Sequence, residues 1–524
     1  MIPILDARGM RAADAETIRR GTASGDLMEA AAEGISAAVG QAYPDWRRVV
    51  VLCGPGNNGG DGLAVARLLA ARGNGVRLFT LDDPGRYRGD PAENLTRACA
   101  AGLVPVSLGS RGGFAALTGA LDEADGVVDA LFGTGLSRPL SGPALRAVRA
   151  VNAAGRPVVS ADVPSGASSD GGALPGAAVR ASVTVALGAP KLCHVLPPAS
   201  GLCGRLVVAE IGIGRAALER RARRLWLTED SDVRTLLPPR PLESNKATFG
   251  RLAIVAGSRG KAGAAILAAR GALRGGAGLV TVFCAESLEP LVVGALPEAM
   301  TVGLPESQGA LAEAGARQLV RALAGFDAAV VGPGLGTAAE TVRLLERVFS
   351  QSRLPIVADA DALNAFAGRL QLFARRGANT ILTPHPGEAA RLLARSTSVI
   401  QADRLGSARE LARRSRAIAV LKGARTLVAA PEGEVAVNPT GTPLLATAGS
   451  GDVLAGLVGA LLAGGLAPRA AAVAGAWLHG AAAEALGARL GDAGLLAHEI
   501  ADVVPRVRAA LRSRPDAGEA DDRD

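Results

Sequence analysis

Residues 49–62 read VVVLCGPGNNGGDG, a β-branched run that passes directly into a glycine-rich loop. The run Val49–Cys53 predicts a buried strand, and the residues after the loop predict a helix. Glycine permits positive φ and close approach of the backbone to a ligand, while a helix N-terminus presents free N–H groups to an anion. The stretch therefore predicts an α/β unit with a ligand-binding loop, and it lacks the G-K-[ST] ending of a P-loop.

Short apolar runs alternate with helical stretches through the rest of the first half, which predicts βαβ units and a mostly parallel sheet. Helices are expected before the first strand, at Met10–Arg20 and Leu27–Gln41. The further strands expected in this half are Val76–Phe79, Gly126–Leu131, Pro157–Ala161, Ser182–Leu187 and Arg205–Ala209.

A second α/β series follows a basic helical stretch and a Pro-rich turn zone, so we expect two different domains and no internal repeat. Its predicted strands are Leu252–Ala256, Leu279–Phe283, Ala328–Val331, Ile356–Asp359, Thr380–Leu382, Ile418–Leu421 and Thr426–Ala429. Its last predicted helices are Asp452–Ala463, Ala470–Leu486 and Ala497–Arg512. We expect a first domain over 1–215, a linker over 216–240, a second domain over 241–512 and a disordered tail over 513–524.

Length and composition exclude several classes of protein. The 524 residues are 49% hydrophobic and 20% charged, which suits two folded domains rather than disorder. No apolar run reaches the roughly 20 residues of a membrane helix, and the N-terminus does not resemble a signal peptide. Five cysteines without a C-x-x-C pair argue against a disulfide framework or a structural zinc site. We expect a soluble, cytoplasmic protein.

The net charge of +8 does not indicate nucleic-acid binding, because the arginines are scattered and aromatic residues make up only 3% of the chain. Lysine is rare and therefore more informative. Lys191, Lys246, Lys261 and Lys422 are the four in the sequence. Since arginine supplies the solvated positive charge, lysine is expected where a compact ammonium is needed.

Three further loops of the first half follow predicted strands, and ligands of open α/β sheets bind beyond the carboxyl ends of strands. They read VDALFGTGL at 128–136, DVPSG at 162–166 and APK at 189–191. Together with GNNGGDG at 56–62, they resemble the NAD(P)H-hydrate epimerase domain, and the resemblance covers about residues 1–215. It implies a Rossmann-like three-layer domain that acts on a nicotinamide ring hydrated beside its nitrogen.

The epimerase resemblance also implies roles for individual residues. A potassium ion would be held through oxygen atoms of Asn58, Asp129 and Ser165. Epimerisation requires proton transfer, for which a positioned carboxylate is suited; Asp129 and Asp162 are the two candidates, and the sequence does not choose between them. The implied substrate-binding residues are Asn57, Asn58, Gly59, Gly60, Asp61, Gly133, Thr134, Gly135, Leu136, Ser137, Arg138, Pro139, Asp162 and Lys191.

The most specific motif of the second half is TAGSGD at 447–452, which opens a predicted helix. Its glycines and free N–H groups form an anion hole, and Asp452 is placed to take a proton from a substrate hydroxyl. Its companions are GSRGKAG at 257–263, GPGLG at 332–336, DADALN at 359–364, LTPHPGE at 382–388 and KGART at 422–426.

This series resembles the ADP/ATP-dependent NAD(P)H-hydrate dehydratases of the ribokinase-like fold, over about residues 241–510. Many small-molecule kinases of that fold carry N-x-x-E where this chain has His385-x-x-Glu388, a departure that matches the dehydratases. The resemblance implies that Glu388 organises Mg²⁺ through water. Ala262, Gly334, His385 and Asp452 would contact the hydrated nucleotide. The implied adenine-nucleotide contacts are Lys422, Gly423, Ala424, Arg425, Thr426 and Gly451.

Together the two resemblances identify the chain as a bifunctional NAD(P)H-hydrate repair enzyme. The second domain would phosphorylate the ring hydroxyl with ADP or ATP and eliminate phosphate, and the first would interconvert the R and S epimers of NADHX and NADPHX. Two alternatives stay open: a small-molecule kinase with an accessory domain, and a non-catalytic first domain. We expect a homo-oligomer with small-molecule substrates and neither nucleic-acid nor membrane partners; nucleotide preference is not determined.

Overall fold

The computed structural model describes residues 1–136 and 138–513, which form two compact units that divide between Leu227 and Thr228. The division falls inside the stretch 216–240 that was expected to be a linker. In the structure that stretch carries most of helix α8 (Arg215–Glu219), strand β9 (Leu225–Leu227) and helix α9 (Asp230–Leu236). Ser137 and residues 514–524, which include most of the expected tail, lie outside the described residues.

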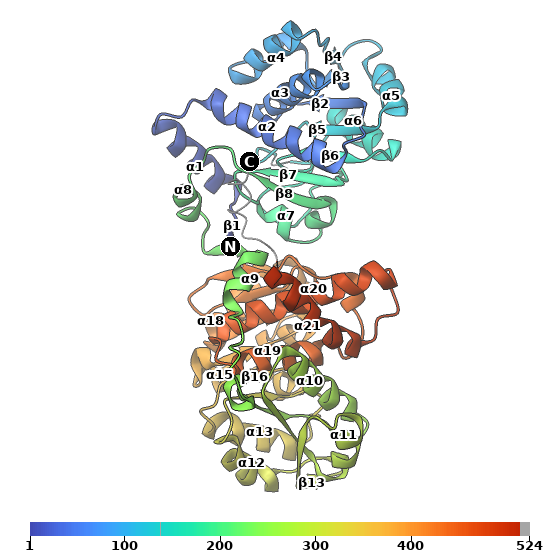
Figure 1. The fold of residues 1–524 in the computed structure, drawn as a ribbon. Coiled ribbons are helices and arrows are strands. Elements are labelled where there is room, and N and C mark those ends of the chain that lie inside the picture. The colour runs from blue at the N-terminus through green and yellow to red at the C-terminus, as the bar shows by residue number, and fades with distance from the viewer. Residues whose placement is uncertain (137, 514–524) are drawn as a thin grey trace. The chain divides into compact units, whose positions relative to one another are not determined.

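The N-terminal unit is built on a seven-stranded sheet in the order β4-β3-β2-β5-β6-β7-β8, with all neighbours parallel (Figure 1). The elements of this unit are β1 (Ile2–Pro3), α1 (Ala7–Arg19), α2 (Ser24–Ala42), β2 (Arg48–Cys53), α3 (Asn57–Ala71), β3 (Gly75–Thr80), η1 (Pro84–Arg86), α4 (Asp90–Ala100), β4 (Val106–Ser107), α5 (Gly113–Glu123), β5 (Gly126–Ala130), α6 (Gly142–Ala154), β6 (Val158–Ala161), β7 (Val183–Leu187), α7 (Leu192–Val195), η2 (Ala199–Leu202), β8 (Arg205–Ala209), α8 and β9.

Strand β2 shows why this unit has three layers. Val49, Val51 and Cys53 pack into a core with α2 and α3, whereas Val50 and Leu52 pack into a second core with α5 and α6. Successive side chains of a strand point to opposite faces, so an unbroken apolar run needs a helical layer on each side. The expected three-layer α/β architecture is confirmed.

The C-terminal unit has a larger sheet in the order β20-β19-β18-β17-β16-β15-β10-β11-β12. Its elements are α9, η3 (Lys246–Phe249), β10 (Arg251–Val255), α10 (Ala262–Gly275), β11 (Leu279–Ala285), η4 (Glu286–Leu288), α11 (Glu289–Ala295), β12 (Met300–Leu304), β13 (Glu306–Ser307), β14 (Ala310–Leu311), η5 (Glu313–Gly315), α12 (Ala316–Leu323), β15 (Ala328–Val331), α13 (Ala339–Gln351), β16 (Ile356–Ala358), α14 (Asp361–Ala365), α15 (Gln371–Ala374), η6 (Gly377–Asn379), β17 (Thr380–Leu382), α16 (Pro386–Leu393), α17 (Thr397–Ala402), α18 (Arg404–Ser415), β18 (Ile418–Leu421), β19 (Leu427–Ala429), β20 (Val435–Val437), η7 (Pro443–Leu445), α19 (Ser450–Ala463), α20 (Pro468–Leu490) and α21 (Ala497–Ser513).

The strands from β12 to β18 pair in parallel, and β18, β19 and β20 are antiparallel. Strands β15, β17 and β18 begin and end where the sequence predicts them. Two strands of this sheet were not predicted, β12 and β20. Most of β12 is only partly buried, so it lacks the continuous apolar run that marks the central strands.

Helix α19 packs on the sheet and against α10 without intervening side chains. A Cβ at Gly456 would lie 1.9 Å from the Ala268 carbonyl oxygen, and a Cβ at Gly271 would lie 2.4 Å from that of Val453. Glycine is therefore required on both helices, because any larger residue would push them apart. This contact holds the start of α19 above the sheet.

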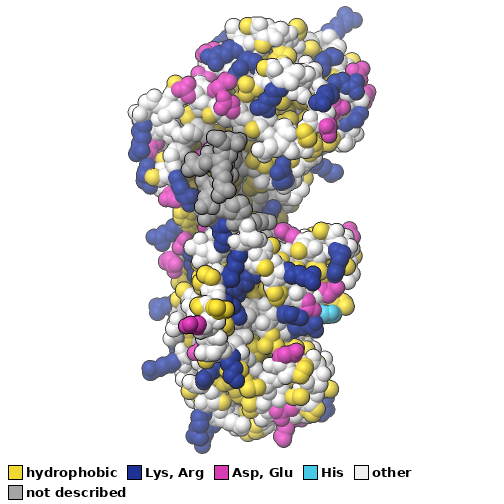
Figure 2. All heavy atoms as spheres, viewed as in Figure 1, with side chains coloured by type: hydrophobic (Ala, Val, Ile, Leu, Met, Phe, Trp, Pro, Cys, Tyr) yellow, Lys and Arg dark blue, Asp and Glu magenta, His cyan; other side chains and the backbone are white. Residues whose placement is uncertain are grey.

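Charged side chains are mixed over the face shown in Figure 2, where Lys and Arg lie among acidic and apolar residues. This distribution agrees with the scattered arginines of the sequence. Among the described residues, no helix is both long enough and apolar enough to cross a membrane.

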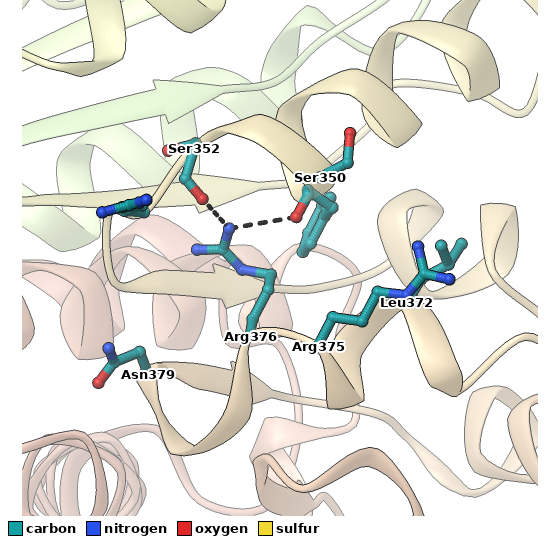
Figure 3. Close-up of a pocket in the computed structure, with 8 residues that line it drawn as sticks. Ser350, Ser352, Leu372, Arg375, Arg376 and Asn379 are labelled. Atoms are coloured by element: carbon teal, nitrogen blue, oxygen red, sulfur yellow. Dashed lines mark hydrogen bonds between the residues drawn. The ribbon is translucent and has the colours of Figure 1, made fainter.

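A hollow of about 380 Å³ lies beside the amino ends of β16 and β17, with Arg376 at its centre (Figure 3). The Arg376 guanidinium donates hydrogen bonds to the carbonyl oxygens of Phe349, Ser352 and Leu354. These bonds tie the last turn of α13 to the following loop, where a cation also suits the helix dipole. Burial lowers the pKa of Arg376 to about 10. We interpret this arginine as structural.

Replacing Arg376 with Met is expected to destabilise the C-terminal unit by about 2–4 kcal/mol, because buried carbonyl groups lose a charged donor. The neighbouring Arg375→Met is the matched control, since Arg375 is exposed and lines the same hollow. Calorimetric unfolding of the two variants should show a lower transition only for Arg376→Met. Equal transitions would contradict the structural role.

Candidate active sites

The carboxyl ends of β2, β5, β6 and β7 meet at a cavity of about 520 Å³ in the N-terminal unit. Most of the predicted substrate-binding residues line it. They are Asn57, Asn58, Asp61, Gly133, Thr134, Gly135, Leu136, Asp162 and Lys191. The strand-end loops therefore converge as the sequence predicts for an open parallel sheet.

Several of the residues predicted to bind the epimerase substrate are not among the described residues that line the cavity. A Cβ at Gly59 would lie 1.7 Å from the Gly54 carbonyl oxygen, and one at Gly60 would lie 2.7 Å from the sulfur of Met28. These two glycines thus allow α3 to start tightly beneath the loop, which is a packing role. Arg138 and Pro139 are exposed and are not among the described residues that line the cavity, and Ser137 lies outside the described residues.

Asp129 is fully buried beneath the cavity and does not line it. Its carboxylate accepts hydrogen bonds from the Ser165 hydroxyl at 2.6 Å, the Ser165 N–H at 2.9 Å and the Ser160 hydroxyl at 2.9 Å. Burial raises the pKa of Asp129, and these donors partly offset the rise. The carboxylate is thus committed to holding the loop after β6.

Asn58 lies beside this network with both amide atoms buried and without a hydrogen-bond partner among the described residues. A Cβ at Gly133 would lie 3.1 Å from Asn58 Oδ1 and 3.0 Å from Asp162 Oδ2, so both oxygens point toward the Gly133 backbone. Buried polar groups are normally paired, and an orphan pair at one side chain marks a place for a ligand.

Asp162 and Lys191 form a buried ion pair with 2.5 Å between Oδ1 and Nζ. Lys191 also donates to the Leu187 carbonyl oxygen at 2.7 Å, and Asp162 Oδ1 accepts the Leu187 N–H at 3.3 Å. Asp162 has φ of 62°, a left-handed conformation that is strained for a residue other than glycine. Strain of this kind is typical of functional sites, where the surroundings hold the side chain in place.

Three further acidic residues line the cavity, Asp14, Asp61 and Asp90. Burial, followed by the neighbouring carboxylates, raises the pKa of Asp61 well above its usual range. Burial also raises the pKa of Asp14 to about 6. Asp14 was not predicted as a site residue, because it lies on α1 outside every strand-end motif and only the tertiary structure brings it to the cavity.

In the C-terminal unit, Asp452 lies in the first turn of α19, whose N-cap Gly449 has φ of 87°. Burial, and then the charge of Asp359, raise the pKa of Asp452 to about 7. A Cβ at Gly451 would lie 3.2 Å from Lys422 Nζ, so this lysine reaches the same helix start. The free N–H groups of α19, the Lys422 ammonium and the Asp452 carboxylate therefore lie together at the start of this helix.

Lys422 is held by buried acidic groups. Its Nζ lies 2.9 Å from Asp359 Oδ1 and 4.0 Å from Glu388 Oε2, and Asp359 also accepts the Thr383 hydroxyl at 2.7 Å. Burial alone lowers the pKa of Lys422, but the two carboxylates outweigh burial and raise it. The ammonium therefore stays charged beside Asp452.

His385 caps helix α16: its Nδ1 accepts the Gly387 N–H at 3.0 Å, and the Glu388 carboxylate accepts the His385 N–H at 2.8 Å. Burial and then the nearby Lys422 lower the pKa of His385, so its imidazole is neutral at pH 7. Burial raises the pKa of Glu388. The H-x-x-E motif is thus a capping box that orients both side chains.

The remaining predicted residues of this unit lie at loop and helix ends. Ala262 is the first residue of α10, and a Cβ at Gly334 would lie 2.9 Å from the Lys261 carbonyl oxygen, so these two loops touch. Residues 423–426 join β18 to β19, with the Thr426 hydroxyl donating to the Gly423 carbonyl at 3.1 Å.

Two more side chains support this site without having been assigned roles from the sequence. Asp361 accepts the Gly336 N–H at 2.8 Å and lies 3.2 Å from Lys261 Nζ. His479, on α20, lies 2.9 Å from the Ser450 carbonyl oxygen, and burial lowers its pKa to about 4. A carbonyl accepts only, so Nε2 of His479 carries the hydrogen. The Asp361 motif was visible in the sequence, whereas nothing there marks His479.

Comparison with known proteins covers both units. The family model for NAD(P)H-hydrate dehydratase matches residues 252–506, and that for the YjeF-related protein N-terminus matches residues 24–193. The bifunctional NAD(P)H-hydrate repair enzyme Nnr of Moorella thermoacetica is 41% identical over 88% of this chain and 87% of its own. The Nnr of Escherichia coli is 37% identical over 92% and 89%.

Among solved structures, the ADP/ATP-dependent NAD(P)H-hydrate dehydratase from Bacillus subtilis, co-crystallized with ATP/Mg²⁺, is 33% identical. It covers 55% of this chain and 98% of its own, with a TM-score of 0.48.

Replacing Asp452 with Asn is expected to stabilise the C-terminal unit above pH 7. The folded pKa of about 7 exceeds the unfolded value of 3.8, so the wild type loses stability as pH rises between them. Asparagine removes this loss, on the order of 1–3 kcal/mol at pH 8 and less toward pH 4. Calorimetry at both pH values measures the difference. Asp492→Asn, at an exposed position of the same unit, should change neither value.

Proposed function

Since this chain belongs to the family of bifunctional NAD(P)H-hydrate repair enzymes, we propose that its two candidate sites divide one repair reaction. The N-terminal unit interconverts the R and S epimers of hydrated NADH and NADPH. The C-terminal unit dehydrates the S epimer to NADH or NADPH at the expense of ADP or ATP. The damaged ring carries its hydroxyl beside the ring nitrogen, and each unit acts on that carbon.

Asp452 carries the dehydratase assignment. Its carboxylate is buried at the start of α19 and has a pKa near neutrality, which suits a general base for the ring hydroxyl. The deprotonated oxygen attacks the terminal phosphorus of the nucleotide, which turns a poor leaving group into phosphate. The nitrogen lone pair then expels phosphate, and loss of a proton from the adjacent carbon restores the dihydronicotinamide.

The helix start and Lys422 stabilise the charge that develops on the transferred phosphoryl group. Free N–H groups of α19 and the Lys422 ammonium converge there, and Gly451 leaves the backbone open to a phosphate. The residues 422–426 and Gly451 form the nucleotide side of the site. Ala262, Gly334 and His385 form the side of the hydrated ring.

Magnesium fits the acidic groups that surround Lys422. The Glu388 carboxyl group is buried, and its pKa is raised. Its oxygen atoms are suitable ligands for water-mediated binding of a hard cation. When bound, Mg²⁺ neutralises phosphate charge. The protein's own contribution is to hold Glu388 in place through the His385 capping box.

Asp162 rather than Asp129 serves the epimerase cavity. Asp162 lines the cavity and is oriented by Lys191, whereas Asp129 is buried and accepts hydrogen bonds from Ser165, so it does not reach the cavity. Both Asp129 and Asp162 were candidates from sequence, and burial distinguishes them. Asp162 then positions the ring through its remaining oxygen, and Lys191 fixes that orientation.

Potassium fits the place between Asn58, Asp129 and Ser165. Asn58 Oδ1 is buried without a partner, and the Asp129 and Ser165 oxygens lie in the adjoining network. A hard cation prefers such oxygen donors. When bound, the ion supplies fixed positive charge for the phosphates of the dinucleotide. Asn58, Asp129 and Ser165 hold it in place.

The decisive experiment uses hydrated NADH as an epimer mixture, with Mg²⁺, K⁺ and either ADP or ATP. The near-ultraviolet absorbance of reduced nicotinamide should return for both epimers, faster than they interconvert spontaneously. Recovery of one epimer alone would make the N-terminal unit a binding module. A stable phosphorylated product without recovery would instead establish a small-molecule kinase.

Asp452→Asn and Asp162→Asn should separate the two activities. Loss of the base is expected to lower dehydration at least ~100-fold while epimerisation persists, and Asp162→Asn should give the reverse. Chromatographic separation of the epimers measures one activity, and recovered absorbance measures the other. Parallel loss of both activities in either folded variant would contradict independent sites.

Asn58→Leu is expected to abolish the response of the N-terminal unit to potassium. In the wild type, K⁺ should raise the melting temperature of this unit and accelerate epimerisation relative to choline, because a ligand that binds the folded state stabilises it. The variant should show neither effect while its dehydration rate stays at the wild-type level. An unchanged thermal response to K⁺ would remove Asn58 from the ion site.

A further inference from the structure

Helix α1 forms a wall of the epimerase cavity, although its residues belong to none of the strand-end motifs. Met10, Asp14 and Ile18 line the cavity, and their spacing of four residues puts them on one face of the helix. Among these three residues, Asp14 alone is ionisable. The helix therefore presents a single carboxyl group to the cavity that the strand-end loops also line.

The Asp14 carboxyl differs from that of Asp162 in having both oxygens free. Asp162 Oδ1 is occupied by Lys191 and by the Leu187 N–H. No hydrogen bond to the side chain of Asp14 occurs among residues 1–136 and 138–513, although this side chain is more than half buried. A partly desolvated carboxyl without a protein partner is available to a substrate.

The charges that surround Asp14 keep it near its titration point at neutral pH. Burial raises its pKa, Lys191 offsets part of that rise and Asp162 adds to it, and together they place the pKa at about 6. The charged groups that face the same cavity are Arg11, Asp61, Asp90, Asp162 and Lys191. A group that gains and loses a proton close to pH 7 is the most effective general acid–base catalyst.

We propose that Asp14 is a catalytic residue of the epimerase site, which moves a proton between the ring hydroxyl and the ring nitrogen. This proposal rests on the proposed epimerase function of the cavity. One oxygen of Asp14 accepts the hydroxyl proton while the C–O bond becomes a carbonyl and the bond from that carbon to the ring nitrogen breaks. The bonding electron pair stays on the nitrogen, which takes from Asp14 the proton that the hydroxyl gave up.

The opened ring carries an aldehyde on a single bond that rotates freely. After rotation the nitrogen attacks the opposite face, gives its proton to Asp14, and the new hydroxyl oxygen receives a proton from Asp14. The carboxylate is regenerated, the hydroxyl oxygen is retained, and no other reactant is consumed. Asp162 and Lys191 hold the ring during this cycle.

Asp14→Asn tests the assignment in the full-length chain, with R-enriched hydrated NADH as substrate and separation of epimers as the readout. We expect kcat for epimerisation to fall at least ~100-fold with little change in KM. In the wild type, kcat should decline below pH 6 as Asp14 becomes protonated, and the variant should lack that decline. Asp122→Asn, on the exposed side of α5, is the matched control and should retain wild-type kcat.

Other outcomes overturn the proposal. A higher KM with unchanged kcat would make Asp14 a binding residue, and a lower kcat with the acidic decline intact would make its role structural. If Asp14→Asn does not fold, Asp14→Glu decides, because a retained carboxyl should keep measurable turnover and the acidic decline. A wild type that fails to accelerate epimerisation would refute the proposed function itself, independently of Asp14.

Discussion

Each unit depends on one lysine, fully buried in the N-terminal unit and partly buried in the C-terminal unit, that holds a carboxylate at the carboxyl edge of its sheet. In the N-terminal unit Lys191 binds Asp162, and in the C-terminal unit Lys422 binds Asp359. An isolated buried charge is strongly destabilising, so each lysine offsets the free-energy cost of burying the carboxylates around it. A compact ammonium suits this task, and two of the four lysines in an arginine-rich chain serve it.

The same low-dielectric surroundings tune the carboxyl groups that the lysines leave unpaired. The pKa of Asp452 rises to about 7 and that of Asp14 to about 6, in both cases chiefly through burial. The buried Asp129 carboxylate instead accepts hydrogen bonds from Ser160 and Ser165. Within each site, hydrogen bonding therefore separates residues that shape the cavity from those that are free to exchange protons.

Much of the fold follows from local pattern. Continuous apolar runs predict the central strands, and β15, β17 and β18 begin and end where the pattern places them. The partly exposed edge strand β12 was not predicted, because it lacks the continuous apolar run of the central strands. The dehydratase site was largely visible, since most of its motifs follow strands directly and TAGSGD opens a helix. In the epimerase site, Gly59 and Gly60 were predicted to bind substrate, and the structure shows that each also leaves room for close packing.

The sequence by itself determined the order of the elements, the two α/β units and the loops that bear polar groups, because these depend on short-range periodicity and on strand-end geometry. Tertiary structure alone decided that Asp14 of α1 lines the cavity of the N-terminal unit. It likewise decided that His479 of α20 contacts the start of α19 in the C-terminal unit. It also decided that Asp162 reaches the cavity while Asp129 does not. Burial and charge proximity arise from contacts between distant segments, which no local pattern encodes.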